Sequence, residues 1–307
     1  MKKTFLSRFI AVSAALTAGL ALAGCGSSGS GSGDTTTAGG DTNSGSASAG
    51  AIAVVSREGG SGTRGAFIEL MGIEVKGEDG SKTDRTTDEA LIANSTNVVM
   101  TQVAGNVGGI GYISLGSLDD TVKAVTVDGT EATVDNILAG TYKVSRPFNI
   151  AVKGDVSDAA KDFMNYILSA DGQAIVQEKS FIPIDSAAAA FSSNGAEGKV
   201  VVGGSSSVSP VMEKLAESYQ AVNPNVKIEI QTTDSSSGMK AAMDGTVDIG
   251  MASRELKDEE KASLTPTVIA MDGIAVIVNK DNPVNALTSD QIMKIYTGEI
   301  TSWDAIQ

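Results

Sequence analysis

Three segments of this chain repeat one arrangement: an apolar run typical of a strand, a loop rich in serine and glycine, and then a helical pattern. They are AIAVVSREGGSGTRGAFIELM from Ala51, KVVVGGSSSVSPVMEKLAESYQAV from Lys199, and VKIEIQTTDSSSGMKAAMDG from Val226. Strands that alternate with helices favour an α/β fold. This repeated arrangement constrains the fold class more than any other feature of the chain.

The three loops also predict a binding site. In open α/β sheets, ligands bind at the carboxyl ends of strands, where these loops lie. The first turn of a helix has N–H groups without partners, and glycine lets the backbone approach a ligand closely. We therefore expect a small tetrahedral oxyanion held by hydroxyls, N–H groups and one or both of Arg57 and Arg64. The alternative is that the serines act only as helix N-caps.

The remaining periodic segments fit the same fold. Apolar runs at 106–115 and 148–152 predict strands, and residues 157–179 predict one amphipathic helix, with Phe163, Ile167 and Leu168 at helical spacing. No loop carries the GKS or GKT ending of a nucleotide P-loop, and none matches GxGxxG. We expect Trp303, the only tryptophan, to lie in the core.

Composition argues against an enzyme. The chain has no histidine, which excludes Ser-His-Asp triads and most zinc sites, and its one cysteine excludes disulfides. A serine hydrolase that uses Ser61 is the alternative from another class, but GGSGT lacks the last glycine of the G-x-S-x-G elbow. We expect no catalytic residue, no metal and no cofactor.

The N-terminus predicts export. Residues 1–24 have a basic start and an apolar run typical of a signal peptide, and Leu22-Ala23-Gly24-Cys25 resembles the lipobox of bacterial lipoproteins. Cys25 would carry the lipid, and residues 25–50 would form a flexible linker to the membrane. Processing leaves 20 Lys and Arg against 37 Asp and Glu, a net charge of −17, so nucleic acid is a poor candidate partner.

Four blocks of the chain closely resemble the phosphate-binding protein of the bacterial ABC phosphate importer. They are SREGGSGTRGAF, GGSSSVSPVMEKLAESYQ, TTDSSSGMKAAMDGTVDIGMASREL and the C-terminal run that ends in LTSDQIMKIYTGEITSWDAI. The resemblance covers nearly all of residues 51–307. It implies a bilobed periplasmic-binding-protein fold of type II, with two α/β lobes joined by crossover strands and the anion between them.

The order of these blocks differs from that of the family, which begins with the GSSSVSP-like block. Here the family's second half comes first and is joined to its first half near residues 185–199, which indicates a circular permutation. Permutation is tolerated where the old termini lie close together and the new cut falls in an exposed loop, so we expect the new ends, Ala51 and Gln307, to lie near each other. A swapped dimer or an artificially rearranged sequence is the alternative. Lobe I would comprise 145–270, and lobe II would combine 51–144 with 271–307.

The resemblance also implies the ligands. By position they are Arg57, Ser61, Gly62 and Thr63 from the first loop, Ser206 and Ser207 from the second, and Ser235 from the third, with Ser236 or Ser237 as near alternatives. Arg57 would supply a charge-assisted contact, unless it forms only a surface ion pair near Glu58.

One position departs from the family. Many members have an aspartate that accepts the proton of hydrogen phosphate where this chain has Arg254. Arg254 would then either add positive charge or pair with a carboxylate such as Glu255. Asp272 is our first candidate for the proton acceptor and Asp234 the second, although either could simply cap a turn.

The resemblance therefore predicts an extracytoplasmic, lipid-anchored, monomeric receptor that delivers inorganic phosphate to an ABC permease in the membrane. Two alternatives stay open. One is a receptor for another tetrahedral oxyanion such as sulfate or molybdate, and the other is a surface lipoprotein for sensing or interaction without transport.

Overall fold

The computed structural model describes residues 50–78 and 81–306. The predicted signal peptide, the lipidated Cys25 and nearly all of the linker lie outside these residues. The strands are β1 (Ala53–Arg57), β2 (Glu74–Lys76), β3 (Lys82–Asp84), β4 (Leu91–Ala93), β5 (Gly109–Ser114), β6 (Val122–Ala124), β7 (Thr126–Val127), β8 (Ser145–Val152), β9 (Gly198–Ser205), β10 (Val226–Thr233), β11 (Ile249–Ala252), β12 (Thr265–Asn279) and β13 (Ala286–Leu287).

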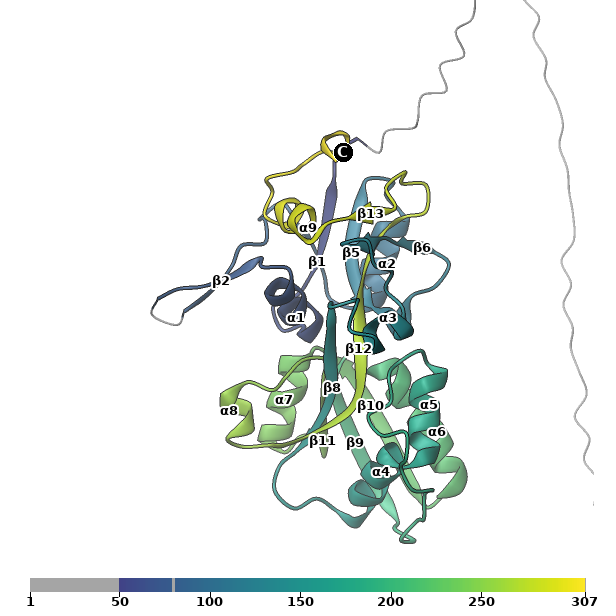
Figure 1. The fold of residues 1–307 in the computed structure, drawn as a ribbon. Coiled ribbons are helices and arrows are strands. Elements are labelled where there is room, and N and C mark those ends of the chain that lie inside the picture. Colours follow the sequence, from purple (N-terminus) through teal and green to yellow (C-terminus); the bar gives the residue numbers. More distant parts are fainter. Residues whose placement is uncertain (1–49, 79–80, 307) are drawn as a thin grey trace, which may run out of the picture. The chain divides into compact units, whose positions relative to one another are not determined.

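The helices connect and cover these strands (Figure 1). They are α1 (Gly62–Leu70), α2 (Thr96–Ala104), α3 (Val134–Leu138), α4 (Asp158–Leu168), α5 (Ala170–Glu178), α6 (Ser209–Val222), α7 (Ser235–Asp244), α8 (Asp258–Lys261) and α9 (Ser289–Tyr296), with short 3-10 turns η1 (Leu115–Ser117) and η2 (Trp303–Ala305).

The main sheet of the described residues is mixed and extends through both lobes. Its strand order is β10-β9-β11-β8-β12-β5-β1-β4, with β6 beside β12. At one end β9 pairs in parallel with β10 and β11, and at the other β1 pairs in parallel with β4 and β5. The long strands β8 and β12 pair antiparallel in the middle. Figure 1 shows these two strands crossing from one lobe to the other, as predicted for this fold class.

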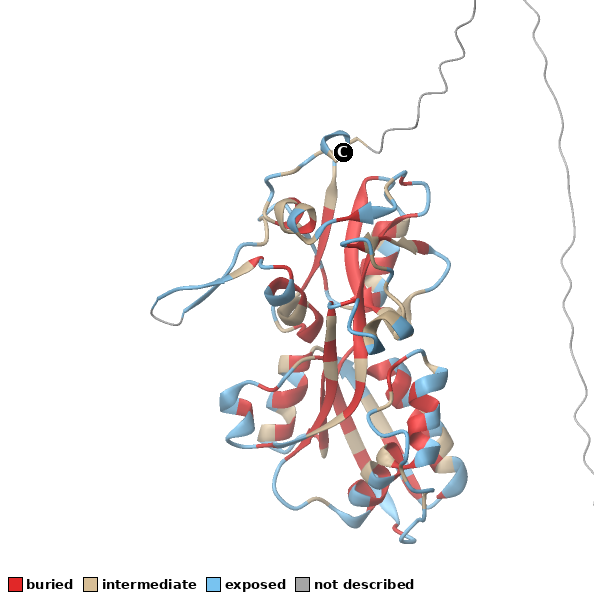
Figure 2. Ribbon diagram, viewed as in Figure 1, coloured by how far each residue is buried: buried red, intermediate tan, exposed pale blue. Residues whose placement is uncertain are grey.

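Figure 2 shows buried residues on both sides of this crossing. The buried apolar side chains form separate clusters on the two sides. Two clusters contain only residues between Phe148 and Ala270, packed around β9, α4, α5, α6 and α7. The other two contain only residues from 54–144 and 274–303, around β1, β5, α1 and α2. Each lobe therefore has its own core, and the lobes meet through β8, β12 and the loops described below.

Local capping signals start the helices after the three loops. The Ser61 hydroxyl caps α1 by accepting the Arg64 N–H at 3.3 Å, and the Asp234 carboxylate caps α7 by accepting the Ser237 N–H at 2.9 Å. Pro210 stands in the first turn of α6, where its missing N–H costs nothing. These caps fix each loop between a strand end and a helix start.

The prediction of one helix over 157–179 is wrong. The segment forms α4 and α5, which meet at Ser169. The Ser169 hydroxyl donates to the Tyr166 C=O at 2.7 Å and accepts the Gly172 N–H at 3.3 Å. Serine competes with the backbone for such bonds, and here it ends one helix and caps the next.

The two ends of the described chain lie together. Ala51 forms an antiparallel bridge with Ser302, and the Trp303 N–H donates to the Gly50 C=O at 2.9 Å. Trp303 is buried in the core of lobe II, as predicted, and its indole N–H donates to the Gly108 C=O at 3.0 Å. Gln307, which was expected near Ala51, lies outside the described residues.

Candidate functional site

The three serine- and glycine-rich loops meet where the lobes face each other. They follow the carboxyl ends of β1, β9 and β10. Three hydrogen bonds join the first loop to the other two: Thr63 Oγ1 to Ser207 Oγ at 2.9 Å, Arg57 Nη2 to Ser206 Oγ at 3.1 Å, and the Ser236 N–H to the Gly60 C=O at 3.2 Å. Loops separated by more than 140 residues in the sequence thus form one polar cluster.

Glycine at two points of the first loop leaves room for the close approach of the opposite lobe. A Cβ at Gly62 would lie 2.5 Å from Ser235 Oγ and 2.8 Å from Ser253 Oγ. A Cβ at Gly60 would overlap the Asp234 carboxylate. A side chain at either position would force these groups of the opposite lobe to shift.

Arg57 lies at the centre of the cluster and only 2% of it is exposed. Its Nε and Nη2 both donate to the Glu58 carboxylate at 2.7 Å. The ion pair with Glu58 that the alternative named therefore exists, but the arginine is buried and also donates to Ser206. Arg64 supports the loop by donating to the Arg57 C=O at 2.6 Å.

The hydroxyls of the cluster are almost fully buried and bond to one another. Ser207 Oγ lies 2.9 Å from Thr63 Oγ1 and 3.3 Å from Thr96 Oγ1. Ser235 Oγ accepts the Ser253 N–H at 3.1 Å. A hydroxyl can donate or accept, so this network can turn its donors toward an anion without leaving a buried oxygen unpaired.

Ser236 lies at the edge of the cluster, where Arg254 is also found. Arg254 pairs with Glu260, with both nitrogen–oxygen distances at 2.8 Å, and its Nη2 donates to Ser236 Oγ at 3.2 Å. The partner carboxylate is thus Glu260 and not Glu255, which contributes only its backbone C=O. Burial raises the pKa of Glu260, but the bonds from Arg254 and the Lys257 N–H outweigh it and leave the pKa below its usual value.

The two candidate proton acceptors have other partners in this structure. Asp272 is buried on β12 opposite Arg146 of β8, and accepts bonds from Arg146 Nη2 at 3.0 Å and Ser114 Oγ at 3.0 Å. Burial raises its pKa to about 6, against the pull of Arg146. Among the described residues, no hydrogen bond joins Asp272 to the loop cluster. Asp234 caps α7, as the alternative for that residue proposed.

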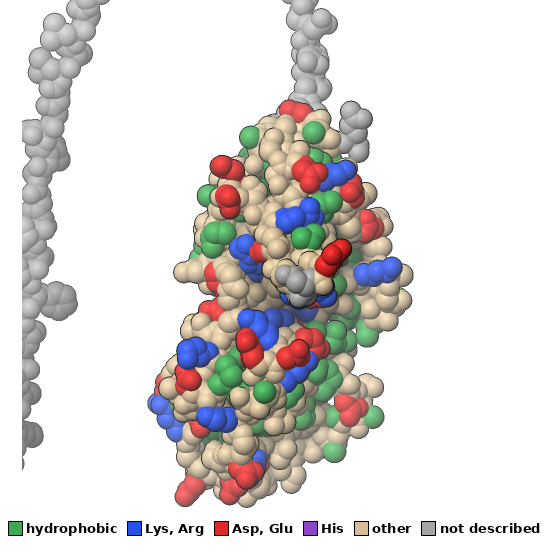
Figure 3. All heavy atoms as spheres, turned by 90° about the vertical axis from the view of Figure 1, so that its left-hand side faces the viewer, with side chains coloured by type: hydrophobic (Ala, Val, Ile, Leu, Met, Phe, Trp, Pro, Cys, Tyr) green, Lys and Arg blue, Asp and Glu red, His purple; other side chains and the backbone are tan. Residues whose placement is uncertain are grey.

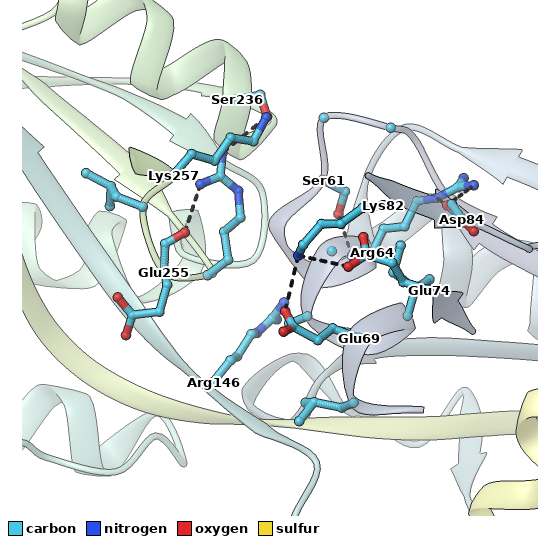
Figure 4. A pocket seen from close by; sticks show the side chains of 18 of the residues that line it. Ser61, Arg64, Glu69, Glu74, Lys82, Asp84, Arg146, Ser236, Glu255 and Lys257 are labelled. Atoms are coloured by element: carbon cyan, nitrogen blue, oxygen red, sulfur yellow. Dashed lines mark hydrogen bonds and ion pairs between the residues drawn. The ribbon is translucent and has the colours of Figure 1, made fainter. Parts of the chain in front are cut away.

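A groove of about 1080 Å³ lies beside the first loop. Figure 4 shows Ser61 and Arg64 on one side of it, Ser236 and Lys257 on the other, and Arg146 below. Its charges largely pair with one another, for example Arg64 with Asp84 at 2.7 Å. Figure 3 shows basic and acidic side chains mixed along this junction. The groove borders the cluster, and its lining combines basic and acidic side chains without an excess of positive charge.

Three residues of the cluster were not predicted: Thr96, Ser205 and Ser253. Ser205 adjoins a predicted residue in the sequence. Ser253 directly precedes Arg254. In the sequence, that turn stands out only because Arg254 replaces the aspartate of many family members. Thr96 follows β4 in a segment with no glycine-rich loop, and nothing in its local sequence separates it from an ordinary helix start.

The described residues contain neither a candidate metal site nor a candidate membrane-spanning helix. Within 50–78 and 81–306 there is no group of three or more His, Cys, Asp or Glu that could hold a metal ion. The same residues contain no helix with the length and apolar character needed to span a bilayer.

Comparisons with known proteins show the family of the chain. A family model described as a PBP superfamily domain matches residues 34–171 and 189–306. The phosphate-binding protein PstS 2 of Streptococcus agalactiae is 55% identical over 254 residues, which are 82% of this chain and 86% of that protein. The chain belongs to the PBP superfamily and to its family of phosphate-binding proteins. PstS 2 of Streptococcus pneumoniae is 46% identical over 83% of this chain and 88% of its own.

A solved structure has the same fold. The phosphate-binding protein of a phosphate ABC transporter from Streptococcus pneumoniae TIGR4 superposes with a TM-score of 0.68 at 46% identity, over 84% of this chain and all of that one. These relatives are transport proteins and not enzymes, which agrees with the prediction that the chain has no catalytic role. The hydrolase alternative is also weakened by Ser61, whose hydroxyl caps α1.

Proposed function

We propose that this protein captures inorganic phosphate between its lobes and delivers it to an ABC permease. The observation that carries the proposal is the cluster itself, in which Arg57, Ser61, Gly62 and Thr63 of lobe II meet Ser206, Ser207, Ser235 and Ser236 of lobe I. The family membership supports the same ligand, because the relatives are named for phosphate binding.

The chemistry of the cluster suits a tetrahedral oxyanion. Its donors are mostly hydroxyls and N–H groups at the starts of α1, α6 and α7, and these direct partial positive charge at one point. Arg57 adds a planar fork whose charge is matched by Glu58. Binding by oriented dipoles also explains how a chain with an excess of acidic residues can hold an anion.

Binding requires the lobes to close around the ligand, as in other bilobed receptors. We propose lobe bounds of 145–270 for lobe I and of 51–144 with 271–307 for lobe II. The division of the buried clusters at these positions supports the bounds. β8 and β12 would then be the segments that bend when the lobes move.

We further propose that the chain is a circular permutation of the common family order, with the old termini joined near 185–199. The contact between Ala51 and Ser302 supports it, since a permutation needs new termini at one place on the surface. The alignment with the Streptococcus agalactiae protein extends over 82% of this chain, so both proteins carry the blocks in the same order. This shared order argues against an artificial rearrangement. Sedimentation would distinguish the monomer from a swapped dimer.

The location follows from the N-terminus and from the family. We propose an extracytoplasmic receptor, held at the cell membrane by a lipid on Cys25 and the linker 26–50. Cys25 lies outside the described residues. Metabolic labelling with a fatty acid, compared between the wild type and Cys25→Ser, tests the anchor.

A second candidate ligand is another oxyanion such as sulfate or molybdate. One observation favours it: Asp272, our proposed acceptor for the phosphate proton, is engaged by Arg146 and Ser114. A receptor that cannot accept this proton would distinguish phosphate from sulfate poorly.

Calorimetric titration with phosphate, repeated in excess sulfate, distinguishes a phosphate receptor from a broader oxyanion receptor. Tight one-to-one binding that survives sulfate supports a phosphate receptor. Binding that sulfate abolishes supports the broader oxyanion receptor. If the folded protein binds none of these anions, the transport proposal is wrong and a sensing or interaction role becomes the better reading.

A further inference from the structure

One residue outside the three loops reaches the same cluster. Thr96 is the first residue of α2 and is only 3% exposed. Its Oγ1 accepts from Arg57 Nη1 at 3.4 Å and lies 3.3 Å from Ser207 Oγ. A hydroxyl can accept one of these bonds and donate the other, so both contacts can exist together.

The register of lobe II places Thr96 there. β4 pairs in parallel with β1, with Ala93 opposite Arg57, and the Glu58 N–H donates to the Ala93 C=O at 3.1 Å. The residues that follow β4 must therefore pass beside the first loop. Ser95 then caps α2 through the Val98 N–H at 3.3 Å, which fixes the helical turn that contains Thr96.

The contacts of Thr96 complete the environment of Arg57. Glu58 holds Nε and Nη2 of the guanidinium, and Ser206 accepts a second bond from Nη2. Nη1 has Thr96 as its hydrogen-bond partner among the described residues. Without the threonine hydroxyl, one edge of the buried fork would have no acceptor, and a guanidinium binds best when its plane is fixed.

Thr96 also links the two lobes. It belongs to lobe II, whereas Ser207 comes from lobe I, so their bond can form only when the lobes are together. Ser207 Oγ lies between Thr63 and Thr96, which start two different helices of lobe II. Loss of the Thr96 hydroxyl therefore affects both the orientation of Arg57 and the closed arrangement.

We propose that Thr96 is a positioning residue of the anion site, whose hydroxyl holds Nη1 of Arg57 and the Ser207 hydroxyl of the opposite lobe. This role rests on the proposed function. It belongs to a segment that neither the loop pattern nor the family blocks singled out.

The test uses Thr96→Val, which removes the hydroxyl and keeps the branched shape, and Thr96→Ser, which keeps the hydroxyl. Thr101→Val is the matched control, because Thr101 lies on the same helix, is exposed, and bonds only within it, to the Asn97 C=O at 2.9 Å. Phosphate affinity and dissociation rate are measured for each variant, and thermal unfolding without phosphate reports the fold.

We expect Thr96→Val to weaken phosphate binding about tenfold, the loss of one hydrogen bond to a charged group, mainly through faster dissociation. Thr96→Ser and Thr101→Val should bind as the wild type does. Wild-type affinity in Thr96→Val, or an equal loss in Thr101→Val, would overturn the role of Thr96 alone. If Thr96→Val fails to fold, Thr96→Ala replaces it with the same criteria. A wild-type protein that binds no oxyanion would overturn the proposed function, and this role with it.

Discussion

Two arginines of this protein are equally buried, at 2% exposure each, and yet have different surroundings. Arg57 pairs with Glu58, whose side chain is 20% exposed, and turns its other donors toward hydroxyls, one of them from the opposite lobe. Arg146 pairs with the fully buried Asp272 between the crossover strands. One arginine lies among hydroxyls that can rearrange, and the other is held between two paired strands of the sheet.

The difference shows what makes a buried charge available to a ligand. Neutral hydroxyls can exchange a bond to arginine for a bond to an anion at little cost, because they both donate and accept. Asp272 cannot leave Arg146 without stranding a buried charge. Nη1 of Arg146 is buried with no hydrogen-bond partner among the described residues, yet Phe148 stacks near its guanidinium at 5.5 Å. We therefore keep Arg57 as the proposed binding arginine and expect Arg146 to hold the crossover strands together.

The largest expected effect is on stability, from Arg146→Ala. This change leaves the Asp272 carboxylate buried without its cation, which costs about 3–5 kcal/mol of unfolding free energy. Urea unfolding of the ligand-free protein measures it. Lys240→Ala, which breaks the exposed pair with Asp244, should change little. A loss below about 1 kcal/mol for Arg146→Ala would contradict the structural role.

The second prediction concerns Arg57→Ala. Removing the charged donors should weaken phosphate binding about 100-fold, since bonds to charged groups contribute about 1.5–3 kcal/mol each. Unfolding without phosphate should change less than in Arg146→Ala, because Glu58 can still reach water. Arg57→Lys keeps the charge but not the fork, and intermediate binding would show that the fork matters. If Arg57→Ala loses stability and keeps affinity, the comparison of the two arginines is reversed.

The third prediction tests the close approach of the lobes. Gly62→Ala should weaken phosphate binding about tenfold, because its Cβ would meet Ser235 and Ser253 and disfavour the closed form. Gly59→Ala is the matched control from the same loop, since nothing lies within 4 Å of the Cβ position there. Calorimetry on both variants measures the effect. Equal affinities would mean that the lobes do not close as tightly on phosphate as they do here.

The smallest effect is on the pH dependence of stability. The pKa of Asp272 is raised by burial from its ordinary value to about 6, so the folded protein binds this proton more tightly than the unfolded chain. The contribution of Asp272 to stability is therefore present at pH 4 and is lost as the pH rises through 6. Relative to Asp272→Asn, the melting temperature of the wild type should be higher by about 2 °C or more at pH 5 than at pH 7.5. A difference that is constant with pH would show that Asp272 keeps its charge throughout.

Local sequence signals predicted much of the fold. Strand and helix periodicity indicated the α/β alternation, and Ser61 caps the helix that follows the first loop, as the N-cap alternative for the loop serines proposed. These signals act over one or two turns, so they can be read without the rest of the chain. The break at Ser169 was missed because the apolar spacing continues across it, and only the side-chain bonds of that serine end the helix.

The sequence by itself determined which residue types face the candidate site, since Arg57 and the serines stand in loops with a specific spacing. Only the tertiary structure decided which groups they contact. Arg254 pairs with Glu260 through the packing of α8, Asp272 meets Arg146 through the register of two strands, and Thr96 reaches Arg57 because β4 lies beside β1. Such contacts depend on strand register and on the approach of two lobes, which are long-range properties that no short segment encodes.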